Sequence, residues 1–219
     1  MKKLIIYGTG SHAELVYAYF VKDSNYKVVA FTVEQAYYQQ KEHFGLPVFC
    51  FEEIENHFSH QEAEMFIGVG PYYLNAVLEK LCIQSKAKGY QLANYRPSNN
   101  NTLFLPTFGE NTFIDDASRF HPYVQFGNGV TSIDSQFGHH SKIGDYSFIS
   151  AALIGGNVTI EDHVFIGMGS IVKSGVHIGK GSFIGMGCII NKDVEPHSVY
   201  SVQGTKKREG LDARKLRSF

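Results

Sequence analysis

Residues 160–191 read IEDHVFIGMGSIVKSGVHIGKGSFIGMGCIIN, and this stretch decides the fold. A helix repeats about every 3.6 residues and a strand about every two, so neither produces a period of six. A short strand plus a turn does, and three such units close one triangular coil of about eighteen residues. An aliphatic residue occupies every sixth position without a slip: Ile160, Ile166, Val172, Ile178, Ile184 and Ile190.

The rhythm continues toward the N-terminus through Phe137, Ile143 and Ile149, with one five-residue step from Ile149 to Ile154. Glycine often follows the aliphatic residue and serine recurs at the fifth place, which suits tight corners. If the aliphatic side chains point inward, successive coils stack them on one another. The pattern therefore predicts a left-handed parallel β-helix. We expect Ile166, Ile178 and Ile184 inside it, and earlier turns at Phe120 and Phe126.

The first 90 residues have a different pattern. Short apolar runs at 3–7, 27–31 and 65–70 predict strands, and the first of them ends in the turn GTGS. Apolar stripes at helical spacing follow the first and third runs; the second helix is expected to begin at Pro71 and to end near Gly89. Alternating strands and helices predict a small Rossmann-like parallel sheet. We therefore expect four segments: a Rossmann-like domain at 1–90, a junction at 91–111, the β-helix at 112–203 and a tail at 204–219.

Composition excludes several classes of protein. The chain of 219 residues is 43% hydrophobic and 19% charged, and its formal net charge of −1 gives no general attraction to nucleic acid or to an anionic membrane. Cys50, Cys82 and Cys188 form no CxxC pair, which favours reduced thiols. The apolar run after the first lysines is too short for a signal peptide or a membrane span. We expect a soluble cytoplasmic protein.

Two motifs carry a resemblance to a known family: KLIIYGTGSHAE at 3–14 and FGHHSKIGDYSFIS at 137–150. In this order, and joined to the hexapeptide repeat, they resemble the bacterial sugar acetyltransferases that include bacillosamine and perosamine N-acetyltransferases and the sialic acid O-acetyltransferase. The resemblance implies a homotrimer with acetyl-CoA in the groove between neighbouring β-helices and no metal. It also implies N-acetylation of a nucleotide-linked amino-deoxysugar for surface-polysaccharide synthesis. O-acetylation of a sialic acid is the alternative.

The resemblance assigns the general base to His139. Imidazole takes up a proton near neutral pH, as attack on a thioester requires. His140 occupies the place where related enzymes tend to carry a carboxylate, so the imidazolium is expected either to be stabilised by Asp134 or Asp145 or to be stabilised more weakly. Both aspartates are equally interpretable as turn residues.

The resemblance also implies cofactor contacts. A backbone N–H among Gly155, Gly156 and Asn157 is expected to hold the thioester carbonyl, with Gly156 favoured; a simple bulge in the rhythm is the alternative. Lys206 and Lys207 are expected to reach the phosphates of CoA, unless they belong to a solvated basic tail.

The loop after the first strand is expected to bind the nucleotide sugar, because backbone N–H groups at a helix start can meet a phosphate. It lacks the third glycine of a dinucleotide fingerprint, so NAD is not expected. Behind the second strand only Glu34 is available to recognise a base. The expected substrate contacts are Gly8, Gly10, Ser11, His12 and Gly70.

Two other classes of function remain open at this point. Some β-helices bind zinc through three histidines, and His139, His140, His163 and His177 lie on the repeats, although at different places in their units. A non-catalytic scaffold or ligand-binding module is the third class.

Overall fold

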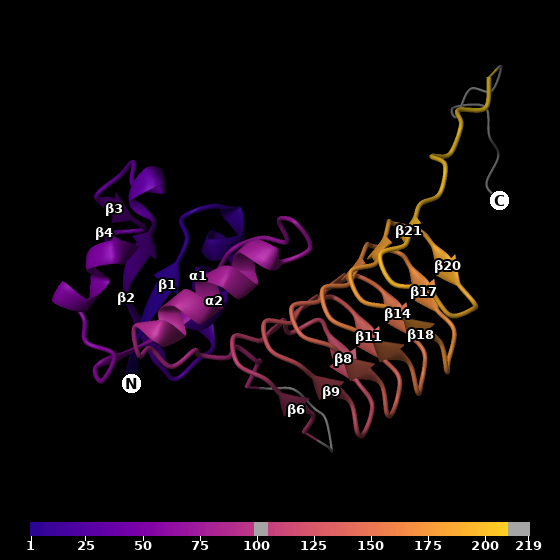
Figure 1. Ribbon diagram of the computed structural model, residues 1–219, viewed down its shortest axis with the longest axis horizontal. Coiled ribbons are helices and arrows are strands. Elements are labelled where there is room, and N and C mark those ends of the chain that lie inside the picture. The colour runs from indigo at the N-terminus through magenta and orange to yellow at the C-terminus, as the bar shows by residue number, and fades with distance from the viewer. Residues whose placement is uncertain (99–104, 210–219) are drawn as a thin grey trace, which may run out of the picture.

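A computed structural model describes residues 1–98 and 105–209. Two units lie side by side: an N-terminal α/β unit and a stack of triangular coils, with the last described residues leaving the far end of the stack (Figure 1). Each unit has its own hydrophobic core, and side chains of the N-terminal unit reach the first coils.

The N-terminal unit is a five-stranded sheet of order β3-β4-β2-β1-β5. All pairings are parallel except the β3–β4 hairpin. The strand β1 pairs with β2 on one side and with β5 on the other. Its residues Leu4 and Ile6 belong to the hydrophobic core on one face of the sheet, and Ile5 belongs to the core on the other face. The elements are β1 (Lys2–Tyr7), α1 (Ser11–Lys22), β2 (Tyr26–Val33), η1 (Gln35–Tyr37), β3 (Glu42–His43), β4 (Leu46–Cys50), η2 (Phe51–Asn56), β5 (Ala63–Ile67) and α2 (Ala76–Ala87).

The second helix does not begin at Pro71 as predicted; α2 begins at Ala76. The reason is a left-handed turn immediately before it, in which Tyr73, Leu74 and Asn75 have φ of 52°, 52° and 64°. Such φ values are unfavourable for residues with a Cβ, so other contacts must stabilise the turn. The turn interrupts the helix that would otherwise begin at Pro71. The stabilising contacts are with the β-helix.

The coils form a prism with three parallel sheets as faces. We call them the phenylalanine face, the aliphatic face and the polar face, after their outward residues. The phenylalanine face contains β7 (Phe113–Ile114), β10 (Thr131–Ile133), β13 (Phe148–Ser150), β16 (Phe165–Ile166), β19 (Phe183–Ile184) and β21 (Val199–Tyr200). The aliphatic face contains β8 (Arg119–Phe120), β11 (Gln136–Phe137), β14 (Leu153–Ile154), β17 (Ile171–Val172) and β20 (Ile189–Ile190). The polar face contains β6 (Thr107–Phe108), β9 (Gln125–Phe126), β12 (Lys142–Ile143), β15 (Thr159–Ile160) and β18 (His177–Ile178).

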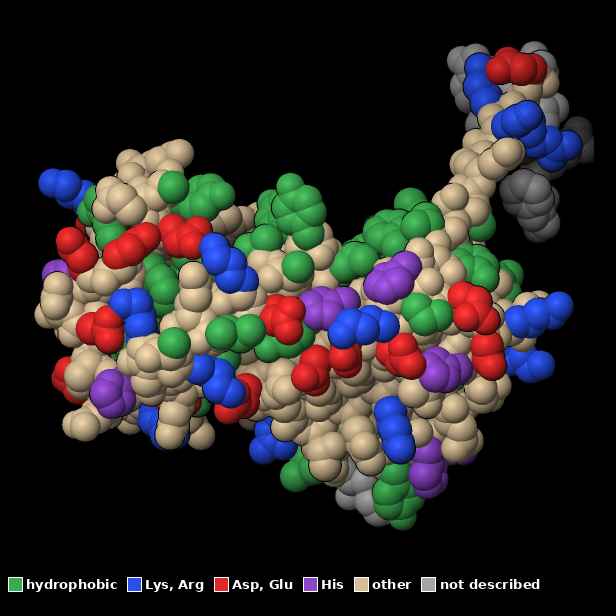
Figure 2. All heavy atoms as spheres, viewed as in Figure 1, with side chains coloured by type: hydrophobic (Ala, Val, Ile, Leu, Met, Phe, Trp, Pro, Cys, Tyr) green, Lys and Arg blue, Asp and Glu red, His purple; other side chains and the backbone are tan. Residues whose placement is uncertain are grey.

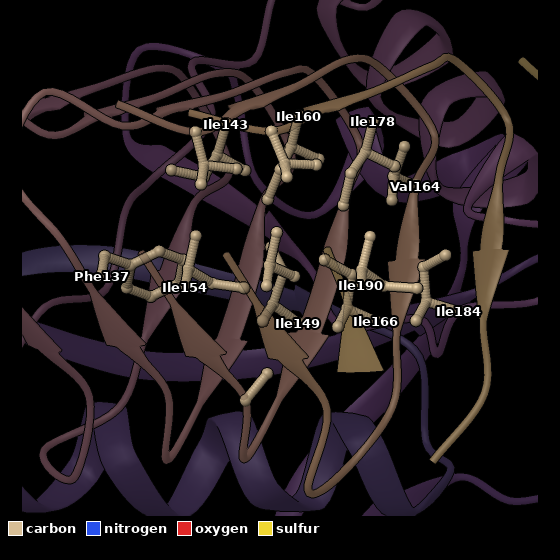
Figure 3. Packing of buried hydrophobic residues seen from close by; sticks show 14 of the residues in the cluster. Phe137, Ile143, Ile149, Ile154, Ile160, Val164, Ile166, Ile178, Ile184 and Ile190 are labelled. Atoms are coloured by element: carbon tan, nitrogen blue, oxygen red, sulfur yellow. The ribbon is translucent and has the colours of Figure 1, made fainter. Parts of the chain in front are cut away.

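The interior matches the predicted register. The side chains of Ile166, Ile178 and Ile184 are fully buried, and Phe120 and Phe126 lie in earlier coils at 8% and 4% exposure. Figure 3 shows the aliphatic side chains of successive coils stacked inside the prism. The six-residue period therefore reports one inward residue per strand.

Buried serines at the corners connect each coil to the next. The hydroxyls of Ser141 and Ser147 donate to the carbonyls of Gly155 and Glu161, at 2.9 and 3.0 Å. Ser170 does the same with Gly185 at 2.9 Å. These bonds satisfy hydroxyls that burial would otherwise penalise.

The shortened step lies at the edge between the phenylalanine and aliphatic faces. Here Ala151 turns the chain with φ 45°, and Asp134 does so one coil earlier with φ 50°. In the following coils Gly169 and Gly187 occupy this edge. The segment Gly155–Asn157 lies at a regular corner between the aliphatic and polar faces, so it is not the bulge that the sequence suggested.

The N-terminal unit packs on the edge between the polar and phenylalanine faces. Asn111 bonds both the N–H and the carbonyl of Ile67, at 2.7 and 3.2 Å. The amide of Asn75 donates to the Tyr146 carbonyl at 2.8 Å. Nδ1 of His163 lies 2.9 Å from the Leu74 carbonyl oxygen. Three of the first four coils thus hold the end of β5 and the left-handed turn.

Within the described ranges, neither helix is long and apolar enough to cross a membrane.

Candidate functional site

The five predicted substrate contacts line one hollow of about 530 Å³ beside the start of α1, which we call the substrate hollow. The turn after β1 supplies Gly8, Gly10, Ser11 and His12, and the strand end after β5 supplies Gly70. Pro71 and Tyr72, which the sequence analysis did not assign to the site, complete the same wall. The structure therefore brings together residues some sixty positions apart.

Gly8 explains how the two strand ends approach so closely. Its φ is 109°, and a Cβ at this position would lie 3.1 Å from the carbonyl oxygen of Gly68. Gly68 in turn packs on Ala13 of α1, where a Cβ would meet backbone at 3.0 Å. Both glycines are needed for space.

His12 faces the β-helix. Its ring centroid lies 6.3 Å from the rings of Phe113 and Phe148, which belong to the phenylalanine face. Burial lowers the pKa of His12 to about 4. The imidazole is therefore neutral near pH 7 and offers one donor and one acceptor to a ligand in the hollow.

His139 lies exposed at the corner after β11, between the aliphatic and polar faces. Its Nδ1 lies 3.1 Å from Nδ1 of His140. The ring of His140 packs on Tyr123 at a centroid distance of 4.6 Å. The neighbouring histidine, not a carboxylate, orients this imidazole.

Asp134 and Asp145 do not support His139. Asp134 lies at the opposite edge of the aliphatic face, where its N–H donates to Asp115. The Asp145 carboxylate accepts from the N–H and the amide of Asn128, at 2.8 and 2.9 Å. Both act as corner residues, and the prediction of a catalytic partner among them has no geometric support.

The next coil places Gly156 against the other side of the imidazole. A Cβ at Gly156 would lie 2.9 Å from Nε2 of His139, so this glycine leaves room for the ring. The N–H groups of Gly155 and Asn157 donate to backbone carbonyls at 2.9 and 2.8 Å. The N–H of Gly156 donates to the hydroxyl of Ser174 at 3.1 Å. A ligand could displace that exposed hydroxyl more easily than it could displace a ladder carbonyl.

Lys206 and Lys207 lie in the extended segment that leaves the last coil (Figure 1). Both are exposed, and Nζ of Lys207 lies 3.6 Å from Glu209. Within one chain they do not approach His139, so their contact with a cofactor remains a prediction.

The histidines considered as zinc ligands do not converge. His163 lies between the Leu74 carbonyl and Glu79, whose Oε2 is 3.3 Å from Nε2. His177 pairs with Glu161 at 2.8 Å on the polar face. Residues 1–98 and 105–209 contain no group of three or more His, Cys, Asp or Glu arranged to hold a metal ion.

Two family models match the chain. Residues 3–81 match the PglD N-terminal domain, and residues 157–192 match the bacterial transferase hexapeptide repeat. The chain thus combines a PglD-type N-terminal domain with a hexapeptide-repeat β-helix. The resemblance inferred from the two motifs and the prediction of a left-handed β-helix are thereby confirmed.

Solved structures of this fold cover almost the whole chain. The acetyltransferase domain of PglB from Neisseria gonorrhoeae, solved with acetyl coenzyme A, is 18% identical, with a TM-score of 0.77 over 90% of this chain and 95% of that one. PerB from Caulobacter crescentus, solved with CoA and GDP-perosamine, is 18% identical, with a TM-score of 0.79 over 91% and 93%. WeeI from Acinetobacter baumannii is 23% identical, with a TM-score of 0.77 over 91% and 96%. No curated protein sequence matches significantly.

In this hexapeptide-repeat chain the two halves of the candidate site lie on different edges of the prism. The substrate hollow lies with the N-terminal unit, beside the edge that carries Tyr146 and His163. His139 lies on the edge between the aliphatic and polar faces. The width of the polar face separates them, so one chain alone does not bring the two together.

Proposed function

We propose that this protein transfers an acetyl group from acetyl-CoA to the amino group of a nucleotide-linked amino-deoxysugar in the cytoplasm, as a step in bacterial surface-polysaccharide synthesis. The observation that carries the proposal is the His139 corner. The exposed imidazole of His139 is oriented by His140 and packs next to Gly156. The N–H of Gly156 donates to the Ser174 hydroxyl, which a ligand can replace. Acyl transfer to an amine needs a general base and a hydrogen-bond donor to the thioester carbonyl oxygen, and this corner offers both groups.

The base function follows from the ring contacts. If Nδ1 of His139 donates its proton to Nδ1 of His140, Nε2 of His139 carries the free lone pair. The acceptor amine gives its proton to that Nε2 as its nitrogen bonds the acetyl carbon. The imidazolium formed keeps its hydrogen bond to His140. His140 is thus a positioning residue, held in turn by Tyr123.

Acetyl-CoA supplies an activated thioester, and the corner supplies the place for its carbonyl. As the amine attacks, negative charge grows on the carbonyl oxygen. The carbon–sulfur bond then breaks, and the departing CoA thiolate takes the proton held by the His139 imidazolium to leave as the thiol. Gly156 lies beside His139, and its N–H can exchange the Ser174 hydroxyl for that carbonyl oxygen. A backbone donor placed there stabilises the charge as it develops.

The outer faces of the prism indicate how the halves of the site meet. The outward side chains Leu153, Ile171 and Ile189 form a ladder on the aliphatic face and are 46%, 43% and 73% exposed. The phenylalanine face carries Phe148, Phe165 and Phe183 in a stacked row. Met168 and Met186, 55% and 65% exposed, lie on the edge that these faces share.

Such a continuous apolar surface favours an interface. In the space-filling view, hydrophobic side chains gather on the β-helix near the base of the C-terminal segment, above a band of charged and His side chains (Figure 2). The occupant we propose is a second copy of the chain. The aliphatic face of one copy packs on the phenylalanine face of the next around a three-fold axis, with the Met168 edge at the centre.

This homotrimer places the His139 edge of one copy beside the N-terminal unit of its neighbour. The base of one subunit then faces the substrate hollow of another, and the polar faces remain in water. The assembly therefore completes the site that one chain leaves divided. It also gives the acetyl-CoA molecule a groove between two β-helices.

A complementation experiment tests the proposal. Gly10→Asp puts a negative charge in the substrate hollow, where a Cβ meets nothing within 4 Å, and should abolish acceptor binding without disturbing the fold. His139→Ala removes the base. Each variant alone should be inactive, whereas mixed trimers refolded together should regain activity, measured as CoA thiol release. Absence of recovery, with a trimeric mass by light scattering, would place the site within one chain.

A screen of acceptors decides the substrate class. Acetyl-CoA is offered with nucleotide-linked amino sugars and, separately, with sialic acid. Thiol release only with the hydroxyl acceptor would replace N-acetylation by O-acetylation, and no release with any acceptor would favour a binding module.

A further inference from the structure

A second hollow, of about 450 Å³, opens on the other side of the Gly8–Gly10 turn. We call it the tyrosine hollow, because Tyr7, Tyr37, Tyr72 and Tyr73 line it together with apolar side chains of α2. It shares Gly8, Gly10 and Tyr72 with the substrate hollow. Its size is that of a small-molecule site, and one extended ligand could occupy both hollows.

Tyr7 is the first sign of a ligand here. The residue is only 4% exposed, and its hydroxyl is buried without a hydrogen-bond partner among the described residues. A buried hydroxyl left unpaired costs about 1–3 kcal/mol. Burial and the nearby Glu34 charge both raise the pKa of Tyr7, so the hydroxyl stays protonated and can donate as well as accept.

Glu34 supplies the charge of the hollow. It is the one carboxylate among the lining residues, and it follows the end of β2. Its Oε1 lies 3.4 Å from Nζ of Lys80, a side chain that is 61% exposed at the rim. An ionised carboxylate only accepts hydrogen bonds, so it selects a ligand edge that carries N–H donors.

The left-handed turn supplies flat walls. Tyr72 and Tyr73 are 66% and 85% exposed; Tyr73 is the first residue of the left-handed turn, with φ of 52°, and Tyr72 directly precedes it. The strain persists because His163 and Tyr146 of the β-helix hold Leu74 and Asn75. Exposed aromatic side chains fixed at a mouth offer faces on which a base can stack.

We propose that the tyrosine hollow binds a guanine base, so that the acceptor is a sugar linked to guanosine diphosphate. The inference rests on the proposed function, because the sugar then reaches the substrate hollow through the shared Gly8–Gly10 turn. Guanine presents N1–H and the N2 amine side by side, which matches the two oxygens of Glu34. Tyr72 stacks on the base, and the Tyr7 hydroxyl bonds a remaining polar atom.

Other bases fit this donor and acceptor set less well. Uracil presents a single N–H between two carbonyl oxygens, and those oxygens would face the Glu34 carboxylate. Adenine presents its amine next to a ring nitrogen that has no proton. A paired set of contacts to one base discriminates by about 1–3 kcal/mol, which corresponds to about a 5- to 150-fold difference in affinity.

Calorimetric titration of the full chain with GDP, UDP and ADP, without acyl donor, tests the inference. We expect GDP to bind at least about tenfold more tightly than the other two. Glu34→Gln should lower GDP affinity and abolish the preference. Glu52→Gln is the matched control, because the Glu52 carboxylate accepts from the Gln35 N–H and does not line the hollow. Tighter binding of UDP or ADP, or an unchanged preference in Glu34→Gln, would overturn the assignment.

Tyr7→Phe provides a second measurement that does not depend on charge. It removes only the unpaired hydroxyl, so GDP affinity should fall while the melting temperature without nucleotide does not. If GDP affinity is unchanged, Tyr7 does not contact the base and the inference fails.

The outcomes separate the base from the reaction. GDP preference without acetyl transfer to any acceptor would leave the base assignment standing and refute the proposed function. Acetyl transfer to an amino sugar linked to UDP, with no GDP preference, would do the reverse.

Discussion

The β-helix and the N-terminal unit bury similar aliphatic side chains but build their cores in different ways. In the β-helix one inward residue per strand meets its equivalents in the coils above and below, as Ile160 meets Ile143 and Ile178. In the N-terminal unit, β1 is placed between β2 and β5, which come from distant parts of the sequence. Stacking of equivalent residues gives the β-helix a regular surface. Packing of segments that are distant in the sequence leaves irregular hollows in the N-terminal unit.

The chemistry is divided in the same way. The regular unit carries His139, the proposed base, in contact with His140 and next to Gly156. The irregular unit carries the two hollows and His12. In the proposed function, the reaction belongs to the β-helix and recognition of the acceptor belongs to the N-terminal unit. Four substitutions test this division.

His139→Ala should have the largest effect. Loss of a general base lowers kcat by about 10²–10⁴-fold, while affinity for CoA changes little because the corner backbone remains. His140→Ala should cost less, since it removes only the orienting contact of 3.1 Å. Steady-state kinetics and CoA titration measure both. A crippled His140→Ala beside a nearly normal His139→Ala would mean that the two roles are reversed.

Ile178→Asp tests the β-helix itself. The side chain is fully buried between coils, so an unpaired carboxylate there should destabilise the protein by several kcal/mol. Thr159→Asp, on the exposed side of the paired strand, should change stability by less than about 0.5 kcal/mol. Thermal melting followed by circular dichroism compares the two. Equal melting temperatures would show that the inward register is wrong.

His12 should make the irregular unit sensitive to acid. Its pKa is about 4 in the folded protein and about 6.5 in an unfolded chain, so below pH 6.5 the unfolded state binds a proton that the folded state does not. Stability should therefore fall as the pH drops from 6.5 to 4, by up to about 3 kcal/mol. Urea unfolding at several pH values should show a weaker dependence in His12→Phe. An unchanged dependence would mean that His12 titrates normally.

His163→Ala should have the smallest effect. It removes the contacts to Leu74 and Glu79 that hold the left-handed turn, which should loosen Tyr72 and weaken nucleotide binding by about 1 kcal/mol. His177→Ala removes a comparable pair with Glu161 on the polar face and should leave nucleotide binding unchanged. Nucleotide titration of both variants makes the comparison. Equal losses of nucleotide affinity in the two variants would show that the left-handed turn does not contribute to nucleotide binding.

The sequence predicts those parts of the structure in which the residue type and its position in a local repeat determine its burial or its backbone conformation. Ile166 and Ile184 point inward because the strand period is fixed, and Gly8 follows β1 because the turn needs its φ. The sequence alone did not indicate which segments, distant along the chain, lie next to each other in the fold. Tyr72 reaches the hollow only because the β-helix distorts the start of α2, and no local pattern signals that contact.

Of the two readings of Asp134 and Asp145, the geometry within one chain favours turn residues over partners of His139. Asp134 is close in sequence, but one strand of the coil carries the chain from one edge of the prism to the next between the two residues. A separation of five positions therefore means a different edge. His140 lies on the same corner as His139, and the adjacency of the two residues in the sequence was the signal for that contact.

The serine connections between coils make the prism modular. Because Ser141, Ser147 and Ser170 form the same bond to the following coil, one coil could be duplicated or removed without redesigning its neighbours. Among the described residues, the hydrogen bonds between the N-terminal unit and the β-helix end at the coil of His163. The coils beyond it carry Ile171, Ile189 and Met186 of the proposed trimer interface, and their number sets how far from His139 the basic C-terminal segment begins.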